Sequence, residues 1–338
     1  HAGALAEDLT EPRPPRAAGP RSLLPDTSQR YEAVSATTTQ DVETLAPVVP
    51  EPVRRAVEDA DPDLDSDLAE WRDPQCRRPK LTVLGPVTAT VHRAVPRVAE
   101  RKAYFTELLA FLALHPAGVS SRQVQDAFGL KASRSRTDLA LLREWLGTDE
   151  RTGEQHLPPA TSSPAHTAHG TSGYQLSGVL VDLDLFRRLR ARAQARGADG
   201  MPDLLSALQL VTGQPFSNLR DAGWSWLLDE ERAHETATFA VVDVAHIVAT
   251  DALARQDLGR ARFAAETACR AAPYDDICRL DLAKVTEAEG HGDQAEKILR
   301  TQVFNRTYDD LPPIDSPDRT RAVAKNNGWD QQRQGSKS

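Results

Sequence analysis

The feature that most constrains this chain is a pattern of turns and small residues that occurs twice in its C-terminal half. Asp257-Leu-Gly-Arg-Ala261 is followed by apolar helical sequence and then by Tyr274-Asp-Asp276. Gly292-Asp-Gln-Ala295 is followed in the same way by Tyr308-Asp-Asp310. The spacing from Ala261 to Ala295 equals that from Tyr274 to Tyr308, and both match a repeat period of about 34 residues. Such a period predicts a helix-turn-helix repeat, in which each unit buries its apolar face against the next.

Helical periodicity extends from about Val179 to about residue 302, so the repeat lies within a longer helical region. We therefore predict tetratricopeptide-like α-helical repeats for residues 179–310, followed by a polar tail at 311–338. Small residues let paired helices approach closely, so Ala261 and Ala295 should occupy equivalent close-packed positions. A helical repeat of this kind favours the binding of a protein partner over catalysis.

Residues 1–80 have no sustained hydrophobic period. They contain 10 Lys and Arg against 16 Asp and Glu, a net charge of −6, and the acidic residues are densest from Glu58 to Asp67. A segment of this composition cannot bury enough apolar surface to offset the entropy of ordering its backbone. We expect residues 1–80 to be a disordered acidic linker; the alternative is an acidic tail that binds a partner.

Order is expected to begin near residue 81, where two short β-branched segments precede three helical patterns. These elements cover residues 81–85, 87–91, 102–115, 120–128 and 133–146. The second helix opens with a capping box, in which Ser120 is the N-cap and Gln123 follows three residues later, and Gly129 stops it. Two extended segments, 155–158 and 173–177, then flank a long hairpin loop. Together these elements predict a winged helix-turn-helix for residues 81–178.

The third helix is the candidate DNA-reading element, because in a winged helix this helix enters the major groove. If Leu139, Leu142 and Leu146 face inward, the outward stripe is Arg134, Asp138, Leu141 and Trp145. The candidate DNA-contacting residues are Lys131, Arg134, Arg136, Thr137 and Arg143, and Arg134 could also reach a guanine edge.

Charge provides an argument against DNA binding. A carboxylate such as Asp138 is repulsive beside phosphates, and residues 81–150 carry 9 Lys and Arg against 7 Asp and Glu, a net of only +2. The net charge of the 338-residue chain is −8, whereas a stand-alone nucleic-acid binder is usually basic. Any DNA binding must therefore rest on a local patch. The alternative is that the arginines form a solvated face on a fold that does not read DNA.

Several other classes of protein are disfavoured. The cysteines Cys76, Cys269 and Cys278 form no C-x-x-C pair, which favours a reducing, cytoplasmic compartment over a disulfide scaffold. We find no apolar run of about eighteen residues that would span a membrane, and no secretory signal. His166 and His169 lack a carboxylate or Cys partner at ligand spacing, so no metal or cofactor is expected. Because no G-x-S-x-G, P-loop, G-x-G-x-x-G or H-E-x-x-H motif is found, we expect no enzyme activity.

Several segments resemble a known family. Leu81-Thr-Val-Leu-Gly-Pro86 resembles the opening strand of activators of the Streptomyces antibiotic regulatory protein family, and Leu142-Arg-Glu-Trp-Leu-Gly147 and Gly173-Tyr-Gln-Leu176 follow in that family's order. Val181-Asp-Leu-Asp-Leu-Phe186 resembles the entry to its second part, the bacterial transcriptional activator domain. The resemblance covers about residues 81–310. His156-Leu-Pro-Pro-Ala-Thr-Ser-Ser163 resembles an actinobacterial branch in which these domains form the cytoplasmic end of LysM-associated membrane proteins.

The resemblance implies a transcriptional regulator that binds DNA through the winged helix and a protein partner through the repeats, with RNA polymerase as the candidate partner. The alternative is a cytoplasmic protein-interaction adaptor of a membrane-anchored protein, with little or no DNA binding. Because the chain begins at His1 and its single methionine is Met201, we expect further sequence upstream, through which any membrane attachment would come. A basic outer face on the third helix would favour the regulator over the adaptor.

Overall fold

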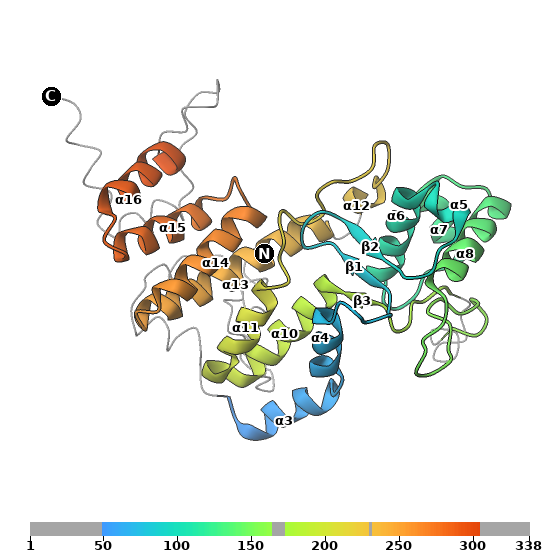
Figure 1. The fold of residues 1–338 in the computed structure, drawn as a ribbon, viewed down its shortest axis with the longest axis horizontal. Coiled ribbons are helices and arrows are strands. Elements are labelled where there is room, and N and C mark those ends of the chain that lie inside the picture. The colour runs from blue at the N-terminus through green and yellow to red at the C-terminus, as the bar shows by residue number, and fades with distance from the viewer. Residues whose placement is uncertain (1–48, 164–172, 230–231, 305–338) are drawn as a thin grey trace, which may run out of the picture.

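The computed structural model describes residues 49–163, 173–229 and 232–304. Within these ranges the chain is mainly helical, with a small three-stranded mixed sheet near its N-terminal part (Figure 1). This agrees with the expected mainly helical class with short strands. The expected polar tail and positions 1–48 of the expected linker lie outside the described residues.

The sheet joins segments that are far apart in the sequence. Its strands are ordered β2-β1-β3 and comprise β1 (Lys80–Thr82), β2 (Thr88–Thr90) and β3 (Leu180–Val181). β1 pairs antiparallel with β2 and parallel with β3, so that Leu81 lies opposite both Ala89 and Val181. Directly after β3, the Asp182 carboxylate accepts hydrogen bonds of 2.9 Å from the backbone N–H groups of Val83 and Leu84. These bonds fix the chain that leaves β1.

Helices α5 (Pro96–Ala99), α6 (Lys102–Ala113), α7 (Ser121–Phe128) and α8 (Ala132–Leu146) lie between β2 and β3. The predicted capping box of α7 is confirmed. The Ser120 hydroxyl accepts from the Gln123 N–H at 3.2 Å, and the Gln123 side chain accepts from the Ser120 N–H at 2.8 Å. Gly129 ends the helix with a φ of +60°, a conformation that glycine adopts without strain. Residues 129–131 alone then connect α7 to α8.

The chain after β3 is a series of helices, namely α10 (Asp182–Arg196), α11 (Met201–Leu208), α12 (Trp226–Asp229), α13 (Ala233–Ala254), α14 (Leu258–Ala271), α15 (Asp276–Ala288) and α16 (Gly292–Ile298), with short helical turns η1 (Gly197–Gly200) and η2 (Leu299–Phe304). α13 packs on α14, α14 on α15 and α15 on α16. α14 begins at Leu258 and α16 at Gly292, so these two helices start one predicted repeat period apart. Ala261 and Ala295 are both buried, as expected for close-packed positions.

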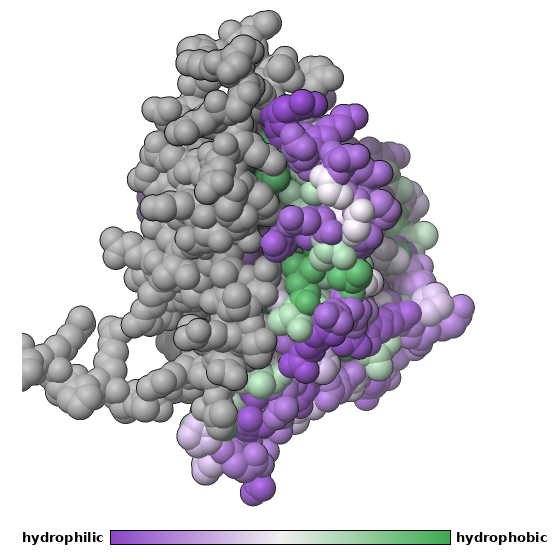
Figure 2. Space-filling model, turned by 90° about the vertical axis from the view of Figure 1, so that its left-hand side faces the viewer, coloured by the Kyte–Doolittle hydropathy of each residue, from purple (hydrophilic) through white to green (hydrophobic). Residues whose placement is uncertain are grey.

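α13 is the longest of these helices, with 22 residues. An 18-residue window of it has a mean hydropathy of 1.5, and it is the one helix in the described part of the chain whose length and composition would suit a membrane span. In the structure 67% of that window is buried inside the fold, as in the core helix of a folded domain. Figure 2 views the molecule from the side of α14–α16, and the described residues visible there are mostly hydrophilic, with hydrophobic areas among them.

The expected disordered linker is wrong for residues 49–80. They include α3 (Glu51–Ala60) and α4 (Leu64–Arg72), and we refer to residues 49–72 as the N-terminal strap. Leu64 and Leu68 of the strap belong to the hydrophobic core. Its acidic run lies against the arginines of α10, with ion pairs Glu58–Arg196 (2.8 Å), Asp61–Arg188 (2.7 Å) and Asp65–Arg192 (2.8 Å). Charge complementarity with a distant helix therefore orders a segment that local composition describes as a linker.

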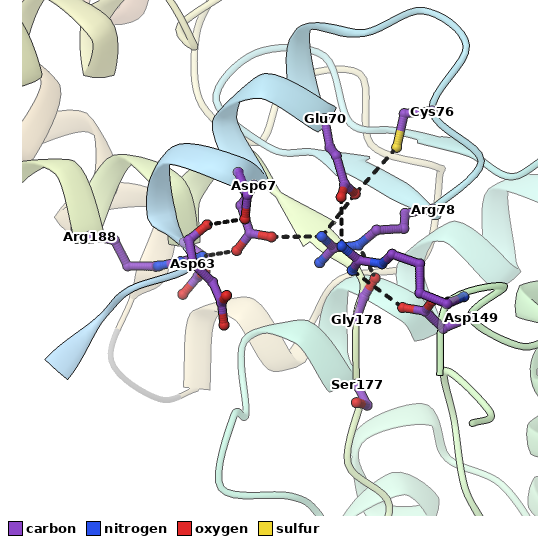
Figure 3. A network of polar contacts seen from close by, with 12 residues as sticks. Asp63, Asp67, Glu70, Cys76, Arg78, Asp149, Ser177, Gly178 and Arg188 are labelled. Atoms are coloured by element: carbon purple, nitrogen blue, oxygen red, sulfur yellow. Dashed lines mark hydrogen bonds and ion pairs between the residues drawn. The ribbon is translucent and has the colours of Figure 1, made fainter. Parts of the chain in front are cut away.

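Asp67 of the strap contacts both neighbouring parts of the chain (Figure 3). Its carboxylate accepts from Arg188 of α10 at 2.7 Å and from Arg78, just before β1, at 2.6 Å. Arg78 also pairs with Glu70 at 3.0 Å and donates to the carbonyl oxygen of Gly178 at 2.9 Å. Burial alone would raise the pKa of Asp67, but the hydrogen bonds from Arg78 and Arg188 outweigh it and hold that pKa below its ordinary value.

A single large hydrophobic cluster extends from Leu64 of α4 through α6, α8 and α13 to Val303. A smaller cluster, formed by Ala252, Ala261, Ala265 and Val285, joins α13, α14 and α15. Residues on both sides of the expected domain boundary at 178/179 thus contribute to one core, and β3 follows that boundary directly. The helices after β3 therefore share a hydrophobic core with α6–α8.

Candidate nucleic-acid interface

α8 lies at the opposite end of the molecule from α16, and its N-terminal half is open to solvent (Figure 1). The side chains exposed there are those of Lys131, Ala132, Ser133, Arg134, Arg136, Thr137 and Ala140. As expected, Leu139, Leu142 and Leu146 are buried. The helix therefore presents a basic face, on which Arg134 is exposed as predicted, and a buried leucine face.

Two members of the expected outward stripe are wrong. Asp138 and Trp145 are buried, with 1% and 5% of their surface exposed, and Leu141 is half-buried. The reason is that α8 contacts α5, α6 and α7 together, so its buried arc is wider than the stripe of three leucines. The expectation of a carboxylate facing the phosphates therefore fails.

Asp138 is the centre of a polar cluster beneath the exposed turns of α8. Its carboxylate accepts from Arg101 Nη1 at 3.0 Å, from the Tyr104 hydroxyl at 2.9 Å and from Arg134 Nε at 3.0 Å. Burial alone would raise the pKa of Asp138, but the hydrogen bonds from Arg101 and Tyr104 outweigh it and lower that pKa. Burial and the bond to Asp138 together raise the pKa of Tyr104 well above its usual range. Asp138 is thus ionised, with its charge balanced inside the protein.

The candidate DNA-contacting residues differ in their surroundings. Lys131 and Arg136 are exposed and form no ion pair with any described residue. The Thr137 hydroxyl donates to the Ser133 carbonyl at 3.0 Å. Arg134 is half-exposed, because its Nε is committed to Asp138. Arg143 is turned away from this group: its Nε donates to the carbonyl oxygen of Leu157 at 2.7 Å, so it supports the chain after α8.

The predicted hairpin after α8 is present only as short contacts. Thr148 and Gln155 form an isolated antiparallel bridge, and Tyr174 pairs with Val119, whose N–H donates to the Tyr174 carbonyl at 2.9 Å. His166 and His169 lie outside the described residues. His156 is buried, which lowers its pKa, and its Nδ1 lies 2.8 Å from the Ser177 carbonyl oxygen. In the described part of the chain no three His, Cys, Asp or Glu side chains are grouped to hold a metal ion.

Sequence reasoning missed another buried carboxylate, Glu107 of α6. It accepts from the Trp224 backbone N–H at 2.7 Å and from Trp226 Nε1 at 3.1 Å, and it forms an ion pair with Arg220. The loop before α12 is thereby attached to α6. Trp226 is buried as expected of a core side chain, and so is Trp224. The available signal was the charged Glu107 at the start of the otherwise apolar segment 107–114, because a charged side chain is buried only when it has hydrogen-bonding or ion-pair partners.

No protein-family model matches this chain, and a search of curated proteins finds no match either.

Proposed function

We propose that residues 80–181 form a winged helix-turn-helix and that its helix α8 binds duplex DNA in the major groove. The order of elements supports this: a strand pair, a run of helices, and a chain that returns beside Val119 through Tyr174. The short connection 129–131 with its left-handed glycine is typical of helix-turn-helix motifs. In such motifs the second helix places its N-terminal residues at the base edges.

The observation that carries the proposal is the charge of the exposed N-terminal half of α8. Lys131, Arg134 and Arg136 lie there, whereas the exposed carboxylate of α8, Glu144, is near its other end. Asp138 does not weaken this face, because it is buried and paired. A local basic face of this kind attracts phosphates even on a chain whose net charge is −8.

The test measures binding of the full chain to random-sequence duplex DNA by fluorescence anisotropy over a range of salt concentrations. We expect affinity to fall steeply with salt. The double variant Lys131→Ala/Arg136→Ala should reduce the magnitude of the salt slope, which is the slope of log affinity against log salt concentration, by about 2, since each phosphate contact contributes about 0.9. Lys297→Ala, which removes an exposed cation of α16, is the matched control and should leave affinity unchanged. No binding at low salt would refute the proposal.

We also propose that α13–α16 are tetratricopeptide-like repeats that bind a protein partner, with RNA polymerase as the candidate. The start of α14 and of α16 at the same phase of the repeat period supports this. A hollow of about 500 Å³ on α14, lined by Phe263, Glu266, Cys269 and Arg270, offers an apolar and charged surface. Phe263→Ser should weaken binding of RNA polymerase to the immobilised chain, whereas Arg55→Ala, exposed on α3 outside the proposed repeats, should not.

The alternative function is a cytoplasmic adaptor of a membrane-anchored protein, in which both ends of the molecule bind proteins. The net charge of −8 favours it, because this charge repels nucleic acid outside the α8 face. The anisotropy experiment separates the two functions: an adaptor would show no salt-dependent duplex binding, and the Lys131/Arg136 double variant would behave like the unaltered chain.

A further inference from the structure

We propose that Asp138 is a positioning residue: by binding Arg134 Nε, it holds the Arg134 guanidinium at the surface of α8 in the orientation that contacts DNA. The inference rests on the proposed function of α8 and adds to it a second, buried layer of residues. It assigns a role to a carboxylate that sequence reasoning regards as an obstacle to DNA binding.

The geometry gives Asp138 this role because Arg134 and Asp138 are four residues apart on one helix face, and their Nε and Oδ2 atoms are 3.0 Å apart. Only the Nε of Arg134 takes part in this contact, and half of the side chain (51%) remains exposed. An arginine anchored at Nε keeps both terminal nitrogens for a phosphate or for the O6 and N7 atoms of guanine. Because the two terminal nitrogens of the guanidinium are held in place before binding, less side-chain rotamer entropy is lost on binding.

Asp138 can act as an anchor because it is itself immobilised. Arg101 and Tyr104, at the start of α6, also bind the carboxylate, and only 1% of Asp138 is exposed. The Arg101 guanidinium carbon lies 4.2 Å from the centre of the Tyr104 ring, and that of Arg220 lies 5.5 Å from it. Arg220 comes from the loop before α12, so the support beneath Arg134 includes a residue from the chain that follows the sheet.

Positioning of Arg134 and simple charge repulsion predict opposite effects of Asp138→Asn on duplex affinity. If Asp138 acted only as a negative charge near the phosphates, Asp138→Asn would tighten duplex binding. If it positions Arg134, Asp138→Asn should weaken binding, because asparagine is uncharged and holds the guanidinium less firmly. The salt slope should then fall toward that of a chain without Arg134.

The experiment is a double-mutant cycle on the full chain, with duplex affinity at low salt as the readout. Arg134→Ala should weaken binding by about 5-fold or more, and Asp138→Asn by about 3- to 10-fold. In the Arg134→Ala background, Asp138→Asn should change affinity by less than about 1.5-fold, because the residue through which it acts is gone. Tighter binding by Asp138→Asn, or equal weakening in both backgrounds, would overturn the proposal.

Two controls separate positioning from loss of fold. Val285→Ala, at a buried site of α15 outside the proposed helix-turn-helix, should lower the melting temperature without weakening binding. If Asp138→Asn does not fold, Tyr104→Phe removes a single hydrogen bond to Asp138 and should weaken binding by about 2-fold, again only when Arg134 is present.

A readout without DNA distinguishes failure of this inference from failure of the proposed function. In nitrogen-15 NMR spectra, the Arg134 Nε–H should exchange slowly with solvent in the unaltered chain and rapidly in Asp138→Asn. Equal exchange in both proteins would refute the positioning role even if DNA binds. Slow exchange together with no duplex binding would refute the function of α8 and leave the anchored arginine in place.

Discussion

Replacing Glu107 tests how strongly the loop before α12 is attached to α6. The carboxylate is 1% exposed and receives three donors, from Arg220, the Trp224 backbone and the Trp226 indole. Hydrogen bonds to a charged group contribute about 1.5–3 kcal/mol each, but they are not additive, and Arg220 can rehydrate because 28% of it is exposed. Release of this loop from Glu107 would also relieve the backbone strain at Ala222 and Trp224, which have left-handed φ angles of +53° and +66°. We expect Glu107→Ala to lower the free energy of unfolding by about 3–5 kcal/mol.

Urea unfolding monitored by tryptophan fluorescence is suited to this test, because Trp224 and Trp226 bind Glu107 directly. Glu107→Gln keeps an acceptor but loses the charge opposite Arg220, and it should cost about 1–3 kcal/mol. Glu51→Ala is the control: its pair with Arg55 is exposed on both sides, so its loss should cost less than about 0.5 kcal/mol. The reasoning is refuted if Glu107→Ala is no more destabilising than Glu51→Ala.

Three further changes test other parts of the fold. Ala261→Leu should overpack the contact of α13, α14 and α15 and lower the unfolding free energy by about 1–3 kcal/mol, whereas Glu266→Leu, exposed on α14, should stay within about 0.5 kcal/mol in the same urea titration. Leu64→Ala should cost about 2–5 kcal/mol; a neutral result would mean that the N-terminal strap contributes no core. Burial raises the pKa of Asp182 from 3.8 to about 7, so the protonated form is favoured in the folded state. Its contribution to stability is therefore complete below about pH 4 and is lost as the pH rises through about 7. Asp182→Asn should flatten the pH dependence of the unfolding free energy between those values, and an unchanged slope would contradict this assignment.

Signals that are local in sequence predicted the structure well. The capping box at Ser120 and Gln123 and the stop at Gly129 are confirmed, because both depend on hydrogen bonds and backbone angles within a few residues. The repeat spacing of α14 and α16 was equally accessible, since a repeated helix pair repeats its turn residues. The inward position of Leu139 and Leu142 followed from helical periodicity.

The failures concern contacts between segments that are distant in sequence. The strap is ordered by pairs such as Asp61–Arg188, whose members are 127 residues apart. Asp138 is buried because Arg101 and Tyr104 reach it from α6, and neither partner is marked by any local pattern. For the candidate DNA face, periodicity separates polar from apolar positions, but it cannot tell an exposed carboxylate from one that is buried with its counter-charges.

The single hydrophobic cluster from α4 to Val303 has a geometric consequence for the proposed regulator. If α8 occupies a major groove and the shared core holds α13–α16 in place, a partner bound to these helices would lie on one side of the duplex. A DNA site for that partner would then have to lie at a fixed rotational phase from the α8 site. Inserting about 5 base pairs, half a helical turn, between the two sites should abolish joint binding, and inserting about 10 should restore it. A flexibly joined pair of domains would tolerate both insertions, so this experiment tests whether the shared core fixes the spacing of the two sites.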